Sequence, residues 1–373
     1  MKIIISLTII ACFELTTSVS YAQTTQINPD TLVERLGKTF IKDKQAVGLS
    51  IGVYSNGTNY FYNFGTTEKG KALLPTKNSI YEIGSITKTF VSLVLANAVL
   101  EKRIRLDDDI RKFLNGSYPN LEYTGKPIKV VHLANTTSGI PNWLPLRTKE
   151  FDTAPSDSIP YLLERTYGSY KEKDFFNALH SVVLDTVPGF KPRHSNAAAQ
   201  LLSYILEKVY KTSIEKLVAK YVLVPVRLNN TSFLASKSES ELLAKGYDEK
   251  GNQTPYFATS FMKGVGGLNS STSDLLKFIK QQLDNKNKAI GLSHKKTFNA
   301  GYYDIGLNWL IYKHDNGNHQ LWTDGGTYGF ISYVIFYPEI NSGIVVLSNE
   351  SDPSTSNKVS DIADNIFNFL GKK

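Results

Sequence analysis

Hydrophobic and polar positions follow two different periods along the chain, strand-like near both ends and helix-like in the middle. Residues 31–42 carry Leu, Val, Leu and Phe at helical spacing, which predicts a first helix. Residues 47–54 and 59–64 read as two strands, and Asn56-Gly57 between them favours a tight hairpin turn. The chain is therefore predicted to begin with a helix and a β-hairpin.

The middle of the chain changes character, and strands return only toward the end. Helices are predicted over residues 86–101, 197–210 and 213–221. Strands are predicted over residues 306–313, 318–324, 331–337 and 343–349, and a last helix carries Val359, Ile362, Ile366 and Phe369 on one face. If the hairpin and the later strands share one sheet, residues 23–70 and 301–373 form an αβ lobe and residues 71–300 an inserted, mainly helical lobe, with a cleft between them.

The first residues have the pattern of an export signal. Met1-Lys2 precedes an apolar run over residues 3–13, and Ser20-Tyr21-Ala22 is a small-x-small site, which predicts a signal peptide over residues 1–22 cut after Ala22. The domain would then span residues 23–373 and be periplasmic or secreted. An uncleaved anchor needs about 20 continuous apolar residues, and Glu14 interrupts the run. A lipoprotein is the alternative, because residues 9–12 resemble a lipobox that would lipidate Cys12 and attach the chain to a membrane.

Composition removes several classes of chemistry. Cys12 is the only cysteine, so a mature chain would have no thiol, disulfide or cysteine-bound metal. The six histidines show no metal-binding spacing, and we predict no metal and no other cofactor. The net charge of +8 is spread over basic residues interleaved with acidic ones, which indicates a solvated surface and no nucleic-acid partner.

A candidate nucleophile stands at the start of the most apolar predicted helix, in Gly84-Ser85-Ile86-Thr87-Lys88. Ser85 and Lys88 are three residues apart and share a helical face. Burial lowers the pKa of a lysine, so Lys88 could act as a base on the Ser85 hydroxyl, and the helix start offers an N–H group for an oxyanion. The spacing alone is not decisive, since it recurs at residues 213/216, 260/263 and 293/296.

Further segments accompany this one in a fixed order. They are Tyr81–Phe90, Leu106-Asp107-Asp108, the stretch HLANTTSGIP at 132–141, Pro188-Gly189, His194-Ser195-Asn196, Gly266-Gly267-Leu268 and the stretch DGGTYGF at 324–330. Together they resemble the class C β-lactamases, the related D-Ala-D-Ala carboxypeptidases and the esterases of the same fold, over nearly all of the predicted mature chain. S-x-x-K with two accompanying motifs is the signature of β-lactamases and penicillin-binding proteins.

The resemblance implies a fold and a mechanism. The fold would be α/β, an antiparallel sheet flanked by terminal helices plus an inserted helical lobe, as in β-lactamases and transpeptidases. Ser85 would form an acyl-enzyme with an amide, β-lactam or ester, activated by Lys88. Asn196 would bind Lys88 and the substrate amide. The N–H groups of Ser85 and of Gly326, which follows Gly325 in the third motif, would hold the oxyanion.

The chain departs from the family pattern where the leaving group and a substrate carboxylate would bind. His194 replaces the family tyrosine; it could pass a proton to the leaving group, which predicts a pH–rate limb near neutrality, or merely bind Asn196 or a backbone group. Thr323 replaces a lysine or histidine, and its hydroxyl supplies no positive charge to a carboxylate. Asp324 adds an acid that strand alternation could turn away from the cleft.

Two smaller points complete the comparison with the family pattern. Thr136 also stands in place of a family histidine, and Arg193 or Lys191 could supply the missing charge. We therefore predict a hydrolase acting on a small molecule or a peptidoglycan-type peptide, with weak activity on β-lactams. The alternatives are an esterase of the same fold and a catalytically silent ligand receptor.

Overall fold

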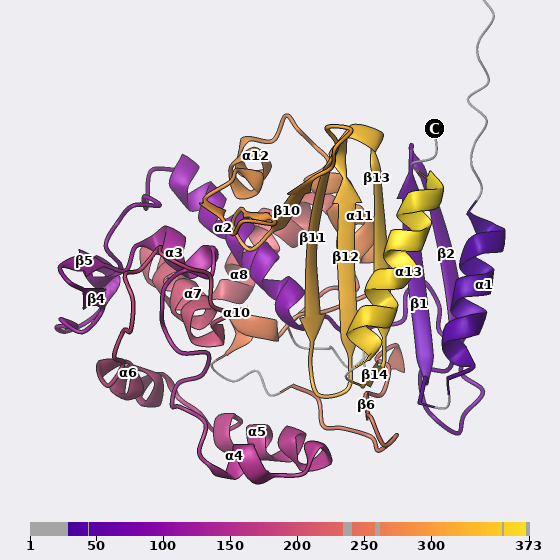
Figure 1. Ribbon diagram of the computed structural model, residues 1–373, viewed down its shortest axis with the longest axis horizontal. Coiled ribbons are helices and arrows are strands. Elements are labelled where there is room, and N and C mark those ends of the chain that lie inside the picture. Colours follow the sequence, from indigo (N-terminus) through magenta and orange to yellow (C-terminus); the bar gives the residue numbers. More distant parts are fainter. Residues whose placement is uncertain (1–28, 44, 234–240, 258–261, 353, 371–373) are drawn as a thin grey trace, which may run out of the picture.

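An antiparallel sheet runs through the structure, and its strands come from both ends of the chain (Figure 1). The computed structural model describes residues 29–43, 45–233, 241–257, 262–352 and 354–370, so the predicted signal peptide, with Ala22 and Cys12, lies outside the described residues. Within these residues the sheet has eight strands in the order β2-β1-β13-β12-β11-β10-β9-β8. They are β1 (Gly48–Ser55), β2 (Thr58–Gly65), β8 (Phe298–Asn299), β9 (Asp304–Ile305), β10 (Leu310–Lys313), β11 (His319–Gly326), β12 (Ile331–Tyr337) and β13 (Ser342–Ser348).

The N-terminal hairpin and the later strands share this sheet. β1 pairs with β13 from Leu49 opposite Ser348 to Ser55 opposite Ser342. The hairpin turns at Asn56 and Gly57, whose φ angles of 46° and 96° are both left-handed, as the Asn-Gly pair predicts. The predicted α/β fold with an antiparallel sheet is confirmed.

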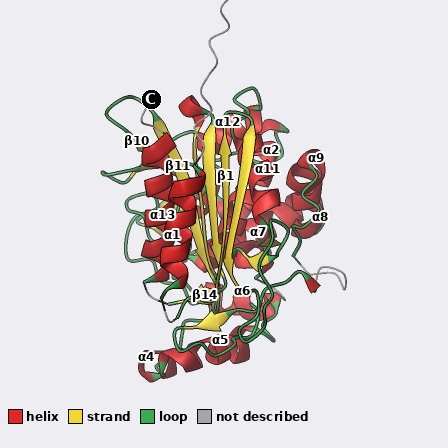
Figure 2. Ribbon diagram, turned by 90° about the vertical axis from the view of Figure 1, so that its right-hand side faces the viewer, coloured by secondary structure: helices red, strands yellow, loops and turns green. Residues whose placement is uncertain are grey.

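The terminal helices cover one face of the sheet (Figure 2). α1 (Asp30–Ile41) packs on β2 and α13 (Thr355–Leu370) on β12 and β13. Because strand side chains alternate, β1 turns Leu49, Ile51 and Val53 toward this layer, where they join Val33 of α1 and Ile366 of α13 in one buried cluster. This layer joins the two ends of the chain but holds none of the candidate catalytic residues.

The opposite face carries the helices that lead to the candidate site. They are α2 (Thr87–Leu100), α11 (Thr272–Gln282) and α12 (Lys288–His294). α2 is buried on nearly every side, as its continuous apolar sequence predicts. Phe90 of α2 stacks on Phe278 of α11 with 4.0 Å between the ring centroids. The helix that begins at the candidate nucleophile is therefore fixed inside the larger hydrophobic core.

The segment between β2 and β8 forms the helical part of the molecule. Its other helices are α3 (Val130–Ala134), α4 (Glu150–Thr153), α5 (Ile159–Tyr167), α6 (Glu172–His180), α7 (Asn196–Tyr210), α8 (Ile214–Val218), α9 (Val224–Val226) and α10 (Lys263–Gly266). Short two-residue strands pair here as β3 (Tyr81–Glu82) with β7 (Asn269–Ser270) and β4 (Glu122–Tyr123) with β5 (Lys126–Pro127), while β6 (Tyr247–Asp248) pairs with β14 (Glu350–Ser351).

Two predicted elements are wrong in part. The helix predicted over residues 213–221 is α-helical only to Val218, and residues 219–223 continue it as a π-helix. The strand predicted from residue 306 begins only at Leu310. Asn308 has a left-handed φ of 56°, which interrupts an extended conformation.

Candidate active site

Ser85 lies where the start of α2 meets the end of β11. It is the middle residue of a 3₁₀ turn, Gly84–Ile86, that leads directly into α2. A Cβ atom on Gly84 would lie 2.7 Å from the Gly326 nitrogen, and one on Gly325 would lie 2.9 Å from the Ser85 nitrogen. Only glycine permits this approach, and Gly84 also has a left-handed φ of 48°. The backbone nitrogens of Ser85 and Gly326 therefore lie at the same close junction between the turn and β11.

A buried hydroxyl fastens the Ser85 turn to the sheet. Ser332 of β12 lies opposite Gly325, and its Oγ donates to the Ile83 carbonyl at 2.9 Å and approaches the Gly325 carbonyl at 3.1 Å. A buried donor that bridges two segments fixes their separation. The Ser85 turn is thus held against the sheet before any substrate binds.

Lys88 connects Ser85 to Asn196 of the His194-Ser195-Asn196 segment. Its Nζ atom lies 2.5 Å from Ser85 Oγ and 3.0 Å from Asn196 Oδ1, at the first residue of α7. The lysine is only 6% exposed. Burial lowers its pKa to about 7, and the negative charge of Asp324 opposes that shift. At neutral pH a large share of Lys88 is uncharged and can accept the Ser85 proton.

The other Ser-x-x-Lys spacings have different surroundings. Lys263 forms an ion pair with Glu215, and Lys296 pairs with Asp304 at 3.1 Å. Among these pairs, the buried amine beside a serine hydroxyl distinguishes Lys88.

His194 is held by a residue that the motifs did not single out. Asn142 Oδ1 lies 3.1 Å from His194 Nδ1 and also accepts the backbone N–H of Asn196 at 3.1 Å. An amide oxygen only accepts, so Nδ1 must carry the proton and Nε2 of the neutral ring remains an acceptor. His194 is therefore hydrogen-bonded to Asn142. Among the described residues, His194 makes no hydrogen bond to Ser85 or Lys88.

The predicted titration of His194 near neutrality is not supported. Desolvation, and secondly the charge of Lys88, lowers the pKa of His194 to about 4, although part of the ring remains exposed. The imidazole is neutral at pH 7. Lys88, in contrast, has a pKa near neutrality.

Thr323 and Asp324 point to opposite faces of β11. Thr323 lies opposite Val334, whose side chain belongs to the core under the helical part, whereas Asp324 lies opposite Tyr333 in the cluster under α1 and α13. Asp324 is exposed at the surface. Desolvation of its carboxyl nevertheless raises its pKa, and the positive charge of Lys88 opposes this rise. The negative charge of Asp324 therefore affects the pKa of Lys88 by electrostatic attraction.

Arg193 and Lys191, the two cations before the His194-Ser195-Asn196 segment, are either paired with another residue or exposed to solvent. Arg193 forms an ion pair with Asp185 at 2.7 Å, and Lys191 is exposed. The Arg193 backbone donates to the carbonyl of Thr136, a residue in left-handed conformation with φ of 61°. Neither cation lines the cavity at Ser85.

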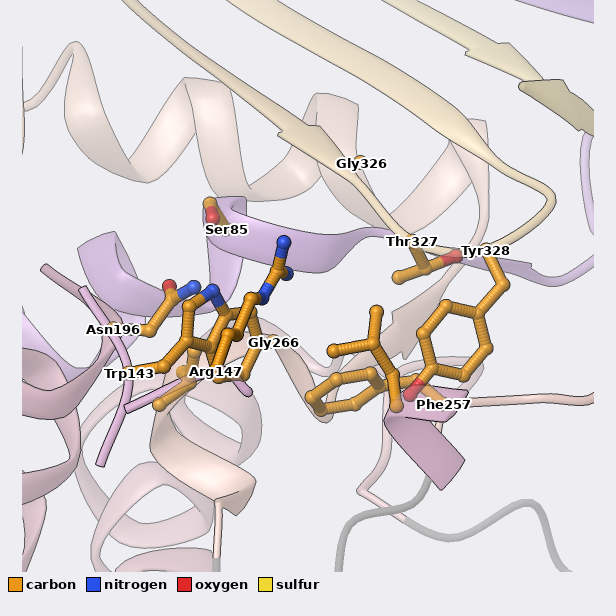
Figure 3. A pocket seen from close by; sticks show the side chains of 11 residues that line it. Ser85, Trp143, Arg147, Asn196, Phe257, Gly266, Gly326, Thr327 and Tyr328 are labelled. Atoms are coloured by element: carbon orange, nitrogen blue, oxygen red, sulfur yellow. The ribbon is translucent and has the colours of Figure 1, made fainter. Parts of the chain in front are cut away.

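A cavity of about 200 Å³ opens beside Ser85 (Figure 3). Asn196, Gly266, Gly326, Thr327 and Tyr328 line it and come from the motif segments. The other lining residues lie outside those segments and are Trp143, Arg147, Leu163, Phe257 and Val265. Trp143 and Arg147 closely follow the stretch at 132–141, which was the one signal for them; Leu163 and Phe257 come from segments with no motif and are brought in only by the fold.

Glu82 is a second residue that sequence reasoning missed. It is 5% exposed, three residues before Ser85, and its Oε1 atom accepts the backbone N–H of Phe257 at 2.6 Å. Desolvation raises its pKa to about 7. Glu82 therefore holds Phe257, which forms one wall of the cavity, in place.

Two further properties bear on the expectations from sequence. Among the described residues, no group of three or more His, Cys, Asp or Glu side chains is placed to hold a metal ion. In the same part of the chain, no helix combines the length and apolar character needed to cross a bilayer.

Comparison with known proteins gives the family. The model of the β-lactamase family matches residues 30–366. A β-lactamase of Yersinia enterocolitica is 25% identical over 93% of this chain and 93% of its own length, and a β-lactamase of Pseudomonas fluorescens is 24% identical over 87% and 94%. The protein flp of Staphylococcus aureus strain MRSA252 is 29% identical over 81% of this chain and 59% of its own length.

Solved structures agree on the fold. A class C β-lactamase superposes with a TM-score of 0.77 at 21% identity, over 91% of this chain and 95% of the other. A β-lactamase/D-alanine carboxypeptidase from Yersinia pestis, complexed with citrate, gives a TM-score of 0.76 at 21% identity, over 92% and 100%. The chain therefore belongs to the β-lactamase family and is a serine hydrolase with the fold of the β-lactamases and D-alanine carboxypeptidases.

Proposed function

We propose that the protein is an exported hydrolase that works through an acyl-enzyme on Ser85. The observation that carries this proposal is the buried Lys88 amine, 2.5 Å from Ser85 Oγ and 3.0 Å from Asn196 Oδ1. Lys88 takes the hydroxyl proton as Ser85 Oγ bonds to the substrate carbonyl carbon. The backbone N–H groups of Ser85 and Gly326 hold the oxyanion. These contacts favour a hydrolase over a silent ligand receptor.

The leaving group then departs with a proton. We assign the transfer from Lys88 to the leaving atom to His194, whose Nε2 accepts and returns the proton while Asn142 holds Nδ1. Water next attacks the ester carbonyl of the acyl-enzyme, loses a proton to Lys88, and releases the acid with regeneration of the Ser85 hydroxyl. Asn196 binds Lys88 and the substrate amide.

The substrate is an amide, a β-lactam or an ester, in a small molecule or a peptidoglycan-type peptide. Relatives named β-lactamase and a structural neighbour named D-alanine carboxypeptidase support these classes. Thr323 lacks the positive charge of the family lysine or histidine, which weakens recognition of a free carboxylate and argues against strong β-lactam hydrolysis. Export rests on the sequence pattern up to Ala22, with lipidation of Cys12 as its alternative.

Mass spectrometry of the intact protein tests the nucleophile. A fluorophosphonate, a β-lactam and an activated ester are each incubated with the wild type, Ser85→Ala and Lys88→Ala. We expect a covalent adduct on Ser85 of the wild type, none on Ser85→Ala and a much slower one on Lys88→Ala. Absence of a Ser85 adduct with all three reagents would refute the proposal, and turnover of D-Ala-D-Ala peptides, nitrocefin and p-nitrophenyl esters then ranks the substrate classes.

A further inference from the structure

The cavity beside Ser85 borders the end of β11. β11 passes Thr323, then Gly326, and the chain continues to Thr327 and Tyr328. The cavity is lined by the residues from Gly326 onward, while Thr323 and His194 are outside its lining. Since the proposed function gives the leaving group to the His194 side, this cavity receives the acyl part of the substrate.

The walls of the acyl-side cavity are mostly aromatic, and one cation projects into it. Trp143, Phe257 and Tyr328 supply the rings. The Arg147 guanidinium lies 4.9 Å from the ring centre of Trp143 and 5.2 Å from that of Phe151, so both rings hold it in place. Figure 3 shows the guanidinium directed into the cavity between Ser85 and Thr327.

The donors in this cavity have no acceptors of their own. In the described part of the chain, Arg147 has no carboxylate within ion-pair distance, whereas the nearby Arg165 is paired with Glu150. The charges of Glu164 and Arg147 shift the pKa of the Tyr328 phenol in opposite directions, upward for Glu164 and downward for Arg147. These two charged residues nevertheless form no ion pair with each other within the residues that the structure describes. The indole N–H of Trp143 is buried and has no acceptor among the described residues. Arg147 is therefore a cation that is open to a ligand.

We propose that this cavity selects acyl groups with an apolar or aromatic body and a carboxylate, which Arg147 binds. The proposal rests on the function proposed above. A guanidinium binds a carboxylate through two parallel hydrogen bonds, and the aromatic walls bury the apolar body. The positive charge absent at Thr323, on the leaving-group side, thus has a counterpart on the acyl side at Arg147.

Matched esters isolate the carboxylate. The p-nitrophenyl monoester of adipic acid carries a free carboxylate, and the p-nitrophenyl methyl diester of the same acid is its neutral counterpart. A charge-assisted hydrogen bond is stronger than a neutral one, and solvent weakens it because Arg147 is exposed, so we expect about a tenfold higher kcat/KM for the anionic ester than for the neutral one. Arg147→Gln should bring the ratio close to one while turnover of the neutral ester persists, and Arg147→Glu should bring it below one.

Arg165→Gln is the matched control, because it removes the same charge from an exposed ion pair outside the cavity; it should keep the wild-type ratio. Raising the salt concentration to about 0.5 M should lower the ratio in the wild type and not in Arg147→Gln. An equal ratio in the wild type and Arg147→Gln would overturn the proposal.

A binding measurement separates this proposal from the function on which it rests. Calorimetry on Ser85→Ala with monomethyl adipate against dimethyl adipate needs no turnover. If Ser85 formed no adduct with the fluorophosphonate, the β-lactam or the activated ester, the proposed function would fail, and weaker binding of the monoacid to Ser85→Ala/Arg147→Gln than to Ser85→Ala would still support the Arg147 site. Equal binding of the two compounds would refute it.

Discussion

At the scale of single residues, the environment of Lys88 departs most from that of an ordinary surface lysine. Its amine is buried between Ser85 and Asn196, and burial lowers its pKa to about 7. Asp324 opposes this shift from the other side of β11. Two opposing effects therefore set the pKa of Lys88: desolvation lowers it, and the negative charge of Asp324 raises it.

This balance predicts the pH dependence of acylation. Since uncharged Lys88 is the base, kcat/KM on an activated ester should rise with pH and level off above a midpoint near 7. Asp324→Asn removes the charge that stabilises the protonated lysine, so the midpoint should move to lower pH with little loss of rate on the plateau. Rates measured from pH 5 to 9 check both; an unmoved midpoint in Asp324→Asn would contradict the coupling.

His194 should affect leaving groups rather than the limb near neutrality. Its pKa of about 4 leaves it neutral above pH 5, so the limb near pH 7 should persist in His194→Phe. Proton transfer by a placed side chain contributes about 10²-fold or more. We expect such a loss on amides and a much smaller one on p-nitrophenyl esters, whose leaving group departs without a proton. Equal losses on both substrates would remove the proton-transfer role.

Sequence reasoning reached the residues that linear motifs carry, and no others. Ser85, Lys88 and Asn196 were identified from their segments, and the structure brings them together. Asn142 escaped because its function depends on the backbone of Asn196, which lies 54 positions away. The cavity walls escaped for the same reason, since a ring that lines a pocket has no local signature until the fold places it.

At the scale of elements, the junction of the Ser85 turn with β11 decides whether the oxyanion site exists. The two segments are so close that a Cβ on Gly325 would lie 2.1 Å from the Ile83 carbonyl oxygen. Ser332 fixes the same junction, because its hydroxyl donates to the Ile83 carbonyl and lies close to the Gly325 carbonyl. Neither feature depends on the side chain of Ser85.

Gly325→Ala should therefore disable catalysis through the backbone. The added methyl group must push the Ser85 turn away from β11 and misplace the oxyanion donors, and loss of one such donor costs about 10²–10³ in kcat. The control is Gly291→Ala in α12, where an added Cβ meets open space and alanine favours the helix by about 0.5–1 kcal/mol. Near-normal kcat in a folded Gly325→Ala protein, checked by its melting curve, would argue against this arrangement.

The elements that periodicity predicted well are the long and regular ones. The predicted strand over residues 331–337 coincides with β12, and the helix predicted over 86–101 differs from α2 by one residue at each end. The two-residue strands β8 and β9 were missed because so short a segment shows no alternation. The π-helical residues 219–223 continue the same apolar pattern as an α-helix, so the pattern could not separate them.

At the scale of the whole molecule, two buried carboxyls far apart in the fold make stability depend on pH. Glu82 accepts the backbone N–H of Phe257, which lines the cavity, and Glu350 in β14 accepts the hydroxyl of Thr355 at the start of α13. They are 5% and 1% exposed. Desolvation raises the pKa of each to about 7, from about 4.5 in the unfolded chain.

The sign of their effect follows from proton binding. Between about pH 4.5 and 7 the folded state keeps both carboxyls protonated while the unfolded state releases those protons, so their contribution to the free energy of unfolding falls as pH rises. The buried histidines act the other way: desolvation lowers the pKa of His132 to about 4 and that of His294 to about 3. The wild-type curve alone therefore does not isolate the carboxyls, and the comparison with a variant does.

We predict that Glu82→Gln/Glu350→Gln gains stability relative to the wild type as pH rises from 5 to 8. Glutamine keeps a carbonyl acceptor for the Phe257 N–H and the Thr355 hydroxyl but never has to be charged, so the gain should be about 1–3 kcal/mol per site. Urea unfolding at several pH values measures it. Glu34→Gln on α1 is the matched control, because Glu34 is exposed and pairs only with Lys38 on the surface. A constant difference between variant and wild type over this range would show that the two carboxyls do not titrate as the buried geometry requires.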